Sequence, residues 1–269
     1  MTVALTEVPT RDELLEHLVA HRIAGDVATS RENNLGNFRR LAERDVRYLF
    51  GIEPDGSWTF TEVLELMASR CGVSRDEAYL EGVDYIDPEL TVGRLEALAD
   101  RLRQAAENRE RVVVATGHPT GLLAVHVEVA RALAAAGCPL LMPAAGWSYE
   151  FQRYGYRHRR EIRYVGGVAV VASRGDLNHT HSPRAMVAML DALRASGEPW
   201  PDLVVADHGW AGAAGQAGVD AVGFADSNDP ALFVAEAEGK VLVTVPLDDN
   251  VQPHLYAPMT AYLLAVAGL

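Results

Sequence analysis

The chain has 269 residues, of which 49% are hydrophobic and 23% charged, so it can bury one large core or two modest ones, and disorder is excluded. Its formal net charge of -13 opposes nucleic acid and anionic membranes, and we expect neither as a partner. Two distant cysteines fit a reducing cytoplasm. The acidic N-terminal segment does not resemble a signal peptide, and no apolar run is long enough to span a bilayer, so we expect a cytoplasmic protein.

Residues 1–109 are predicted to form a helical N-terminal region that caps or covers a second domain. Apolar residues recur at helical spacing in two runs, Leu14, Leu15, Leu18 and Ile23, then Leu95, Leu98 and Leu102. Thr29 with Glu32, and Ser74 with Glu77, have the spacing of capping boxes and predict two helix starts. No segment of this region has the pattern of a strand.

The pattern changes at Arg111, where short apolar runs begin to alternate with helical segments. Six runs are predicted as strands, at residues 112–115, 139–142, 167–171, 203–206, 221–224 and 241–245. Helices are predicted at residues 122–136, at 184–195, in the small-residue segment after Asp207, at 230–238 and from Pro253 onward. This alternation predicts that residues 110–269 form a three-layer, Rossmann-like α/β domain with a mostly parallel sheet of about five to six strands, one or two of them antiparallel at an edge.

Ligands of such a sheet bind beyond the carboxyl ends of its strands, and the loop after residues 112–115 is a candidate anion site there. Its predicted phosphate-binding residues are Thr116, Gly117, Thr120 and Gly121, because the loop leads into a helix N-terminus whose free N–H groups favour anions. His118 in the same loop is a candidate general acid or base. The alternatives are a plain turn and a merely hydrogen-bonded imidazole.

Acidic residues follow two further strands, and we predict a divalent metal site from them. Asp207, Asp226 and Asn228 supply oxygen ligands, and His208 is a further ligand or a catalytic group, as is Asp207 itself. Helix capping is the alternative, and Asp229, which precedes Pro230, is assigned mainly to capping. Asp248 and Asp249 follow the last strand and strengthen the metal hypothesis.

Four weaker signals remain. His179 and His181 form an H-x-H pair that either binds metal or faces the substrate, with a polar loop as the alternative. The basic segment 153–163 contains Arg163, a candidate for binding an anionic substrate; the alternatives are a solvated hairpin and a contact between subunits of a homo-oligomer. Polar residues could also let the N-terminal region cover the cleft: Arg31, Asn33, Asn34, Asn37, Arg39 and Arg40. Four glycines after Asp207, from Gly209 to Gly218, permit close backbone packing.

Blocks spread over nearly the whole chain carry a family resemblance: ATGHPTGLL, AAGWSYE, REIRYVGGVAVV, NHTHSP, VVADHGWAGAAGQAGVD, GFADSNDPALFVAEAEG and VPLDDNVQPHLYAP. They resemble a bacterial, largely actinobacterial family labelled "phosphatase". The layout, with helices before an α/β domain, is also similar to the DUF89 metal-dependent phosphatases, although this chain has Asp207-His208 where that family shows Asp-Asn. The resemblance implies a phosphatase activity.

The residues and the resemblance together lead to one preferred hypothesis, a metal-dependent phosphomonoester hydrolase acting on a small phosphorylated metabolite in the cytoplasm. The expected cofactor is a divalent ion such as Mg²⁺ or Mn²⁺, held by Asp207, Asp226 and Asn228. The Thr116–Gly121 loop would bind the phosphate while His118 protonates the leaving alcohol. The alternatives are a lyase, cyclase or isomerase that uses His118 and His208 for proton transfer, and a non-catalytic sensor of a phosphorylated ligand.

Overall fold

The computed structural model describes residues 8–153 and 155–269. Residues 1–7, on which the prediction about a signal peptide partly depends, and Tyr154 of the basic segment lie outside the described residues. Within the described ranges, no helix has the length and apolar character needed to cross a membrane.

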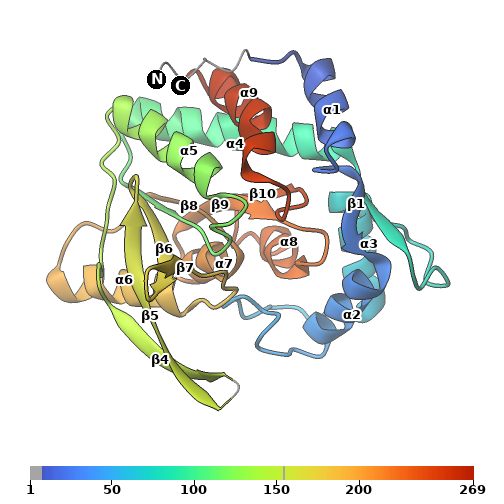
Figure 1. The fold of residues 1–269 in the computed structure, drawn as a ribbon, viewed down its shortest axis with the longest axis horizontal. Helices are drawn as coiled ribbons and strands as arrows, with labels where there is room; N and C mark the ends of the chain where they lie inside the picture. The colour runs from blue at the N-terminus through green and yellow to red at the C-terminus, as the bar shows by residue number, and fades with distance from the viewer. Residues whose placement is uncertain (1–7, 154) are drawn as a thin grey trace.

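A mainly parallel sheet forms the centre of the molecule, with the strand order β10-β9-β8-β3-β6-β5-β4 (Figure 1). The parallel strands are β3 (Val112–Ala115), β6 (Val168–Ser173), β8 (Leu203–Asp207), β9 (Asp220–Ala225) and β10 (Val243–Pro246). An antiparallel hairpin of β4 (Ser148–Arg153) and β5 (Tyr156–Val165) extends one edge, and β7 (Asp176–Leu177) pairs with β6.

Helices cover both faces of this sheet. Side chains of successive strand residues point to opposite faces, so Val113 and Ala115 of β3 join one hydrophobic cluster while Val112 and Val114 join the other. The first cluster includes residues of α2 (Arg31–Ala42), α3 (Phe60–Cys71), α6 (Arg184–Ser196), α7 (His208–Gln216) and α8 (Pro230–Ala237). The second includes residues of α1 (Arg11–Ala20), α4 (Pro88–Asn108), α5 (Leu123–Ala135), the 3₁₀ helix η1 (Pro253–Tyr256) and α9 (Ala257–Ala267). Burial on both faces explains why the strands are continuous apolar runs.

The chain reverses its winding direction between β3 and β8. Numbered among themselves in chain order, the five parallel strands lie in the order 2-1-3-4-5. The helix that follows β3 packs on one face, whereas α6, α7 and α8 between the later strands pack on the other. In doubly wound sheets such a reversal leaves a crevice at the carboxyl ends of the two strands, which is where ligands bind.

The N-terminal region is mainly helical, with start signals that differ from the predicted ones. Capping boxes begin α1 at Thr10 and α3 at Thr59, and Asp87 caps α4. The predicted boxes are wrong: no helix starts at Ser74, and α2 begins after Ser30 without a side-chain cap. The prediction of no strand here is also wrong, because β1 (Gly25–Ser30) and β2 (Val83–Ile86) form an antiparallel pair.

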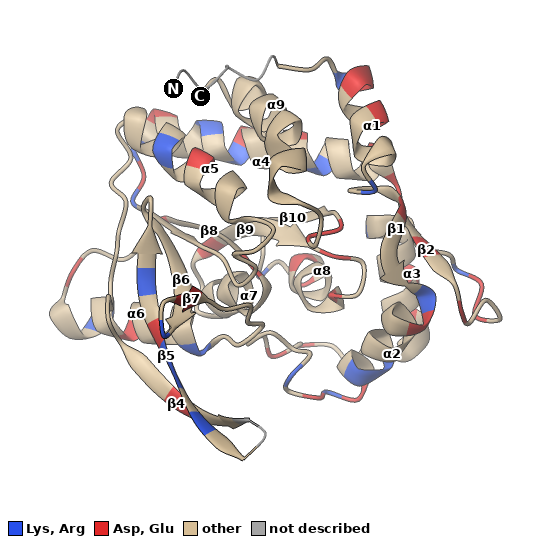
Figure 2. Ribbon diagram, viewed as in Figure 1, with Lys and Arg blue, Asp and Glu red and all other residues tan. Residues whose placement is uncertain are grey.

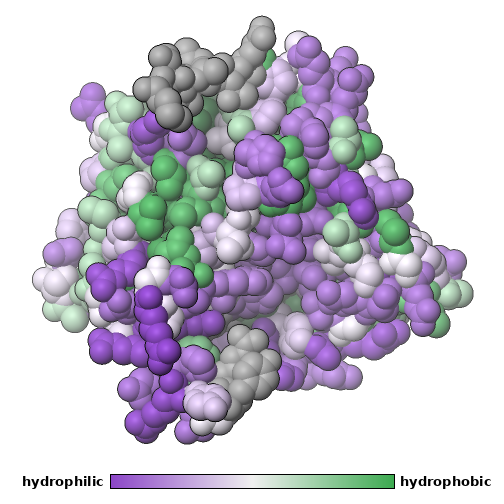
Figure 3. All heavy atoms as spheres, viewed as in Figure 1, coloured by the Kyte–Doolittle hydropathy of each residue, from purple (hydrophilic) through white to green (hydrophobic). Residues whose placement is uncertain are grey.

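Five of the six predicted strands are confirmed, as are the helices of residues 110–269. Residues 139–142 do not form a strand; Leu140 makes only an isolated bridge to Val112. The antiparallel edge strands come instead from the basic segment, whose hairpin projects from the sheet in Figure 1 and is hydrophilic in Figure 3.

Both hydrophobic clusters combine N-terminal with C-terminal residues. Leu35 and Phe38 of α2 share a cluster with Val113, and Leu14 and Leu95 share the other with Val112. A domain boundary at residue 110 remains a prediction.

Candidate active site

A cavity of about 390 Å³ lies at the carboxyl ends of the parallel strands, next to the reversal point between β3 and β8. Its walls carry four imidazoles and four carboxylates, together with hydroxyl and amide groups. The lining residues are Ala28, Thr29, Ser30, Asn33, His118, His179, His181, His208, Asp226, Asn228, Asp229, Asp248, Asp249 and Asn250. Within the described ranges, no lysine or arginine lines this cavity.

His208 stands between three carboxylates at the end of β8. Its φ of 46° is a left-handed conformation that is uncommon for a residue other than glycine. Nδ1 lies 2.8 Å from Asp207 Oδ1, while Nε2 lies 3.1 Å from an oxygen of Asp229 and 3.1 Å from an oxygen of Asp249. Burial opposes protonation of the ring, but the three carboxylates outweigh it and raise the pKa of His208 well above its usual value.

Asp207 lies behind His208 rather than on the cavity wall. One of its oxygens accepts hydrogen bonds from the Gly117 N–H and from His208, and the other accepts one from the Thr116 hydroxyl. Burial alone would raise the pKa of Asp207, but the charge of His208 lowers it. This fully buried carboxylate therefore orients the imidazole and is not positioned for its predicted role as a metal ligand.

The loop after β3 contributes only His118 to the cavity. Its N–H groups are bonded within the protein, since Gly117 donates to Asp207, His118 donates to Thr116, and Gly121 donates to the His118 carbonyl. Thr120 is exposed and does not line the cavity. The structure therefore does not present the predicted phosphate cradle.

His118 itself faces the cavity, with Nδ1 3.3 Å from Asp249 Oδ1. Burial acts to lower the pKa of His118, but Asp249 outweighs it and raises the pKa.

The H-x-H pair does face the cavity. The ring of His179 lies 4.3 Å from that of His118, and the ring of His181 lies 4.4 Å from that of His208, centroid to centroid. Burial and the neighbouring imidazoles lower the pKa of His179 to about 4 and that of His181 to about 2. Both rings are therefore neutral near pH 7, as metal coordination requires.

Three buried carboxylates form the acidic wall. Asp226 accepts hydrogen bonds from the Thr29 hydroxyl and the Ser227 N–H, and Asp248 accepts them from the N–H groups of Ala28 and Asn250. Burial and the charge of Asp249 raise the pKa of Asp226 well above its usual value. Burial would also raise the pKa of Asp249, but His118 and His208 lower it below its usual range.

The donor groups around the cavity fit a divalent cation. Donor atoms of three residues lie within 4.8 Å of one another in each of three groups: His118, His179 and His208; His181, His208 and Asp229; and Asp226, Asp248 and Asp249. In the described part of the chain, two buried atoms at this wall, His118 Nδ1 and Asp249 Oδ2, make no hydrogen bond. Buried polar atoms are rarely left without a partner; a bound ion would satisfy Asp249 Oδ2, while His118 Nδ1 faces Asp249 Oδ1 at 3.3 Å.

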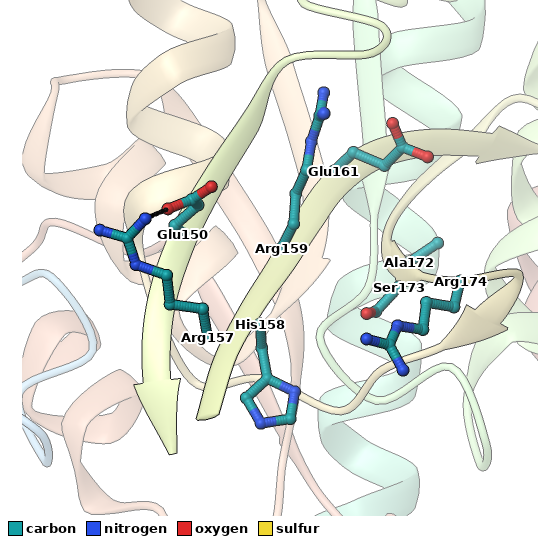
Figure 4. A pocket seen from close by; sticks show the side chains of 8 residues that line it. All are labelled: Glu150, Arg157, His158, Arg159, Glu161, Ala172, Ser173 and Arg174. Carbon is teal, nitrogen blue, oxygen red and sulfur yellow. Dashed lines mark ion pairs between the residues drawn. The ribbon is translucent and has the colours of Figure 1, made fainter. Parts of the chain in front are cut away.

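The basic segment lies at a different place. Figure 4 shows a second cavity, of about 340 Å³, lined by Glu150, Arg157, His158, Arg159, Glu161, Ala172, Ser173 and Arg174. Arg157 lies 3.6 Å from Glu150, and Arg163 on β5 pairs with Glu161 at 2.6 Å. Arg163, the predicted substrate contact, lines neither cavity. Basic residues outnumber acidic ones on the hairpin, whereas residues of both signs are spread over the other elements (Figure 2).

Several site residues were not predicted. Asp229 is the N-cap residue of α8, but its side chain caps nothing and contacts His208, so its assignment to capping was wrong. Asp248 and Asp249 support the metal hypothesis in the sequence without being predicted as ligands, and Thr29 is predicted there as a helix cap. The position of Asp248 and Asp249 just after β10 is the signal that could have indicated them, whereas Thr29 lies within β1 and carries no such signal.

Fold and site together define an α/β protein with a mainly parallel sheet and an imidazole- and carboxylate-lined cavity at its carboxyl edge. The family model "Phosphatase" matches residues 9–269. Phosphatase SCO2771 of Streptomyces coelicolor is 52% identical to this chain over 263 residues, which is 97% of each protein. The chain therefore belongs to the Phosphatase family, and the resemblance inferred from its sequence blocks is confirmed.

Proposed function

We propose that this protein hydrolyses phosphomonoesters of small metabolites with the help of a divalent metal ion. The observation that carries the proposal is the charge of the cavity, where four carboxylates meet without a lysine or arginine among the described lining residues. Crowded and buried carboxylates disfavour their own ionised forms, which is why the pKa of Asp226 is raised, and in ionised form they would repel a phosphate dianion as well. Bound cations would reverse the sign of this interaction.

The donor set supports a metal of this kind. Asp207 is bonded to Nδ1 of His208, so a cation at Nε2 would take the place of the proton that the neighbouring carboxylates stabilise there; metal-binding histidines typically hold their other ring nitrogen against a carboxylate in this way. His208 and Asp229 of one donor group, and Asp226 of another, are therefore proposed as metal ligands, with Asp207 as a positioning residue. Asn228 lines the cavity and remains a proposed ligand or substrate contact. When bound, a divalent ion supplies Lewis-acid stabilisation of phosphate oxygens and lowers the pKa of water.

Protein groups supply the remaining steps. We assign proton donation to the leaving alcohol to His118, whose ring faces the cavity and is oriented by Asp249. His179, the exposed member of the H-x-H pair, is placed to contact the phosphate. The position of the site at the winding reversal supports a Rossmann-like relationship for the sheet.

The substrate has room beyond its phosphate. A neighbouring cavity of about 630 Å³ shares Asn33, His181 and Asn228 with the site and is also lined by Arg40, Arg47 and Tyr48. We propose that the alcohol part of a small metabolite occupies this space. Asn33, Asn37 and Arg40 of α2 line this neighbouring cavity, which supports the predicted role of α2 in covering the cleft.

The test is a phosphate-release screen over a broad panel of phosphomonoesters, with metal-free protein and with protein reloaded with Mg²⁺, Mn²⁺, Co²⁺ or Zn²⁺. We expect turnover only after reloading, and a loss of at least 100-fold in kcat/KM for Asp226→Asn, because a ligand charge is removed. Asp176→Asn on the exposed strand β7 removes the same charge outside the cavity and is the matched control. Full activity without metal, or no phosphate release from any compound, would overturn the proposal.

A further inference from the structure

The carboxylates of the cavity outnumber the charge of one divalent ion. Asp226, Asp229, Asp248 and Asp249 are each no more than 5% exposed, and the lining residues that could offset them are imidazoles. With all four carboxylates ionised, as ligands of a cation are, a single divalent ion offsets two of their four negative charges. Buried charges left without partners are costly, so the composition of the wall favours more than one cation.

Two of the three donor groups share no residue with each other. His181, His208 and Asp229 form a mixed nitrogen and oxygen group, and Asp226, Asp248 and Asp249 form an all-oxygen group. The first resembles the two-histidine, one-carboxylate donor set of catalytic metal sites, and the second suits hard cations. His208 also belongs to a third group, with His118 and His179. Since Nδ1 of this ring is already hydrogen-bonded, His208 can bind metal either with His118 and His179 or with His181 and Asp229, but not with both pairs.

Asp249 connects the two groups. It belongs to the acidic group, and its Oδ2 lies 3.1 Å from Nε2 of His208 in the mixed group. This oxygen is buried and, in the part of the chain that the structure describes, accepts no hydrogen bond. A buried carboxylate whose oxygen lies beside His208 but accepts no hydrogen bond, between two ligand groups, is placed to bridge two ions.

We propose that the cavity is a dinuclear centre that binds two divalent cations, one at His181, His208 and Asp229 and one at Asp226 and Asp248, with Asp249 between them. Two such ions equal the charge of the four carboxylates, and paired ions are used in phosphoryl transfer to hold both the attacking and the leaving oxygen. The catalytic role of the two ions rests on the proposed function, whereas their number is inferred from the donor groups alone.

The experiment measures Mn²⁺ bound to the full chain, because Mn²⁺ accepts both oxygen and imidazole ligands. Metal-free protein is titrated with Mn²⁺ by calorimetry, the bound metal is counted after gel filtration, and electron paramagnetic resonance records coupling between ions. We expect two equivalents per wild-type chain and an exchange-coupled signal. Asp248→Asn and His181→Asn should each retain one equivalent and lose the coupling.

Two variants serve as controls. Asp176→Asn, outside the cavity, should bind two equivalents, and so should His118→Asn, since the proposal leaves His118 out of both ligand sets. Circular dichroism and thermal unfolding of each metal-free variant show that it is folded before binding is compared. Where one variant does not fold, Asp226→Asn replaces Asp248→Asn, or Asp229→Asn replaces His181→Asn.

One equivalent or none in the wild type would overturn the dinuclear centre, as would two coupled ions in Asp248→Asn. Loss of an ion in His118→Asn would overturn the assignment of the mixed group. Failure of the proposed function looks different: two ions without phosphate release would contradict the phosphatase activity alone, and phosphate release with one ion would contradict this inference alone.

Discussion

Asp207 and His208 show how neighbouring residues can have different tasks at one strand end. Asp207 is the last residue of β8, and its side chain is buried in the protein, where three donors bond to its oxygens. The left-handed backbone at His208 turns the side chain of His208 toward the cavity. Non-glycine residues in this conformation carry strain of order 1–3 kcal/mol and cluster at functional sites. The conformation of His208 is therefore consistent with a positioned ligand.

The first prediction concerns Asp207→Asn. The amide keeps the size of the side chain but removes the negative charge at Nδ1 of His208. That charge orients the ring and makes Nε2 a stronger metal ligand, so His208 should bind metal less tightly in the variant. Substituting a residue that holds a metal-binding histidine in place typically costs about 10–100-fold in metal affinity, and we expect a loss of that size in Mn²⁺ affinity by calorimetry.

The control is Asp202→Asn just before the opposite end of β8, where the carboxylate pairs with Arg111. It can lower stability but should leave metal affinity unchanged. Equal loss of affinity in both variants would show that Asp207 acts only through general stability.

Among single residues, the sequence predicted a place at the site for three that lie in the segments after strands, His118, His208 and Asp226. The reason is that the carboxyl ends of parallel strands share one edge of the sheet. It did not predict that Asp229 contacts His208, since the preference of aspartate for N-caps gives the same pattern. Asp207 was also predicted as a ligand on the cavity wall, whereas the structure buries it behind His208. Strand position alone does not show which of two adjacent side chains points outward.

Among the elements, the loops of the site are held together by close backbone contacts at glycines. A Cβ at Gly117 would lie 2.3 Å from the Thr180 carbonyl oxygen, and one at Gly209 would lie 2.2 Å from that of His181. At Gly121 it would lie 2.1 Å from the carbonyl oxygen of Asp249. These positions bring the loops after β3, β8 and β10 and the H-x-H segment close enough to share one cavity.

The second prediction follows from Gly121. In Gly121→Ala the new methyl group must displace the backbone of Asp249, so the carboxylate between the ligand groups moves. We expect at least a tenfold loss of metal affinity or kcat/KM, with a destabilisation typical of overpacking, about 1–3 kcal/mol.

Gly93→Ala in α4 is the matched control, because its Cβ would meet nothing within 4 Å. Alanine is the better helix former there, so this variant should be more stable by up to about 1 kcal/mol and fully active. A Gly121→Ala protein with unchanged metal affinity would contradict the role given to this contact.

The predicted elements succeed and fail for physical reasons. Strands covered on both faces are apolar throughout and were found, whereas β4 and β5 lie at an edge and are rich in arginine, so their pattern is that of a solvated hairpin. Residues 139–142 are apolar enough for a strand but pair through Leu140 alone. The pair β1 and β2 has one bulged, short ladder, which leaves little periodicity to detect.

On the scale of the whole molecule, the N-terminal segments complete both cores and one wall of the site. Thr29 at the end of β1 donates to Asp226, and Asn34 of α2 donates to Ser227. Such long-range contacts leave no trace in the local pattern of either segment. The sequence therefore predicted a covering region without showing that it reaches the ligand carboxylates.

The third prediction tests another long-range contact, between Glu238 after α8 and the segment before α3. The Glu238 carboxylate accepts hydrogen bonds from the N–H groups of Asp55 and Gly56 and from the Trp58 indole, and it pairs with Lys240 at 2.8 Å. Burial alone would raise the pKa of Glu238, but these donors outweigh it and lower the pKa from 4.5 to about 2. The ionised form is therefore bound more tightly in the folded state than the protonated form.

Because the folded pKa lies below the unfolded one, this contribution to stability is complete above about pH 4.5 and is lost as the pH falls toward 2. Glu238→Gln should lower the free energy of unfolding by about 2 kcal/mol at pH 7, the size expected for hydrogen bonds to a charged group. Urea denaturation at pH values from 7 to 3 should show this difference from wild type shrinking as the acid protonates Glu238. Glu107→Gln on the exposed surface of α4 removes the same charge and should match the wild type throughout. A difference that stays constant from pH 7 to 3 would mean that the charge of Glu238 does not anchor the segment.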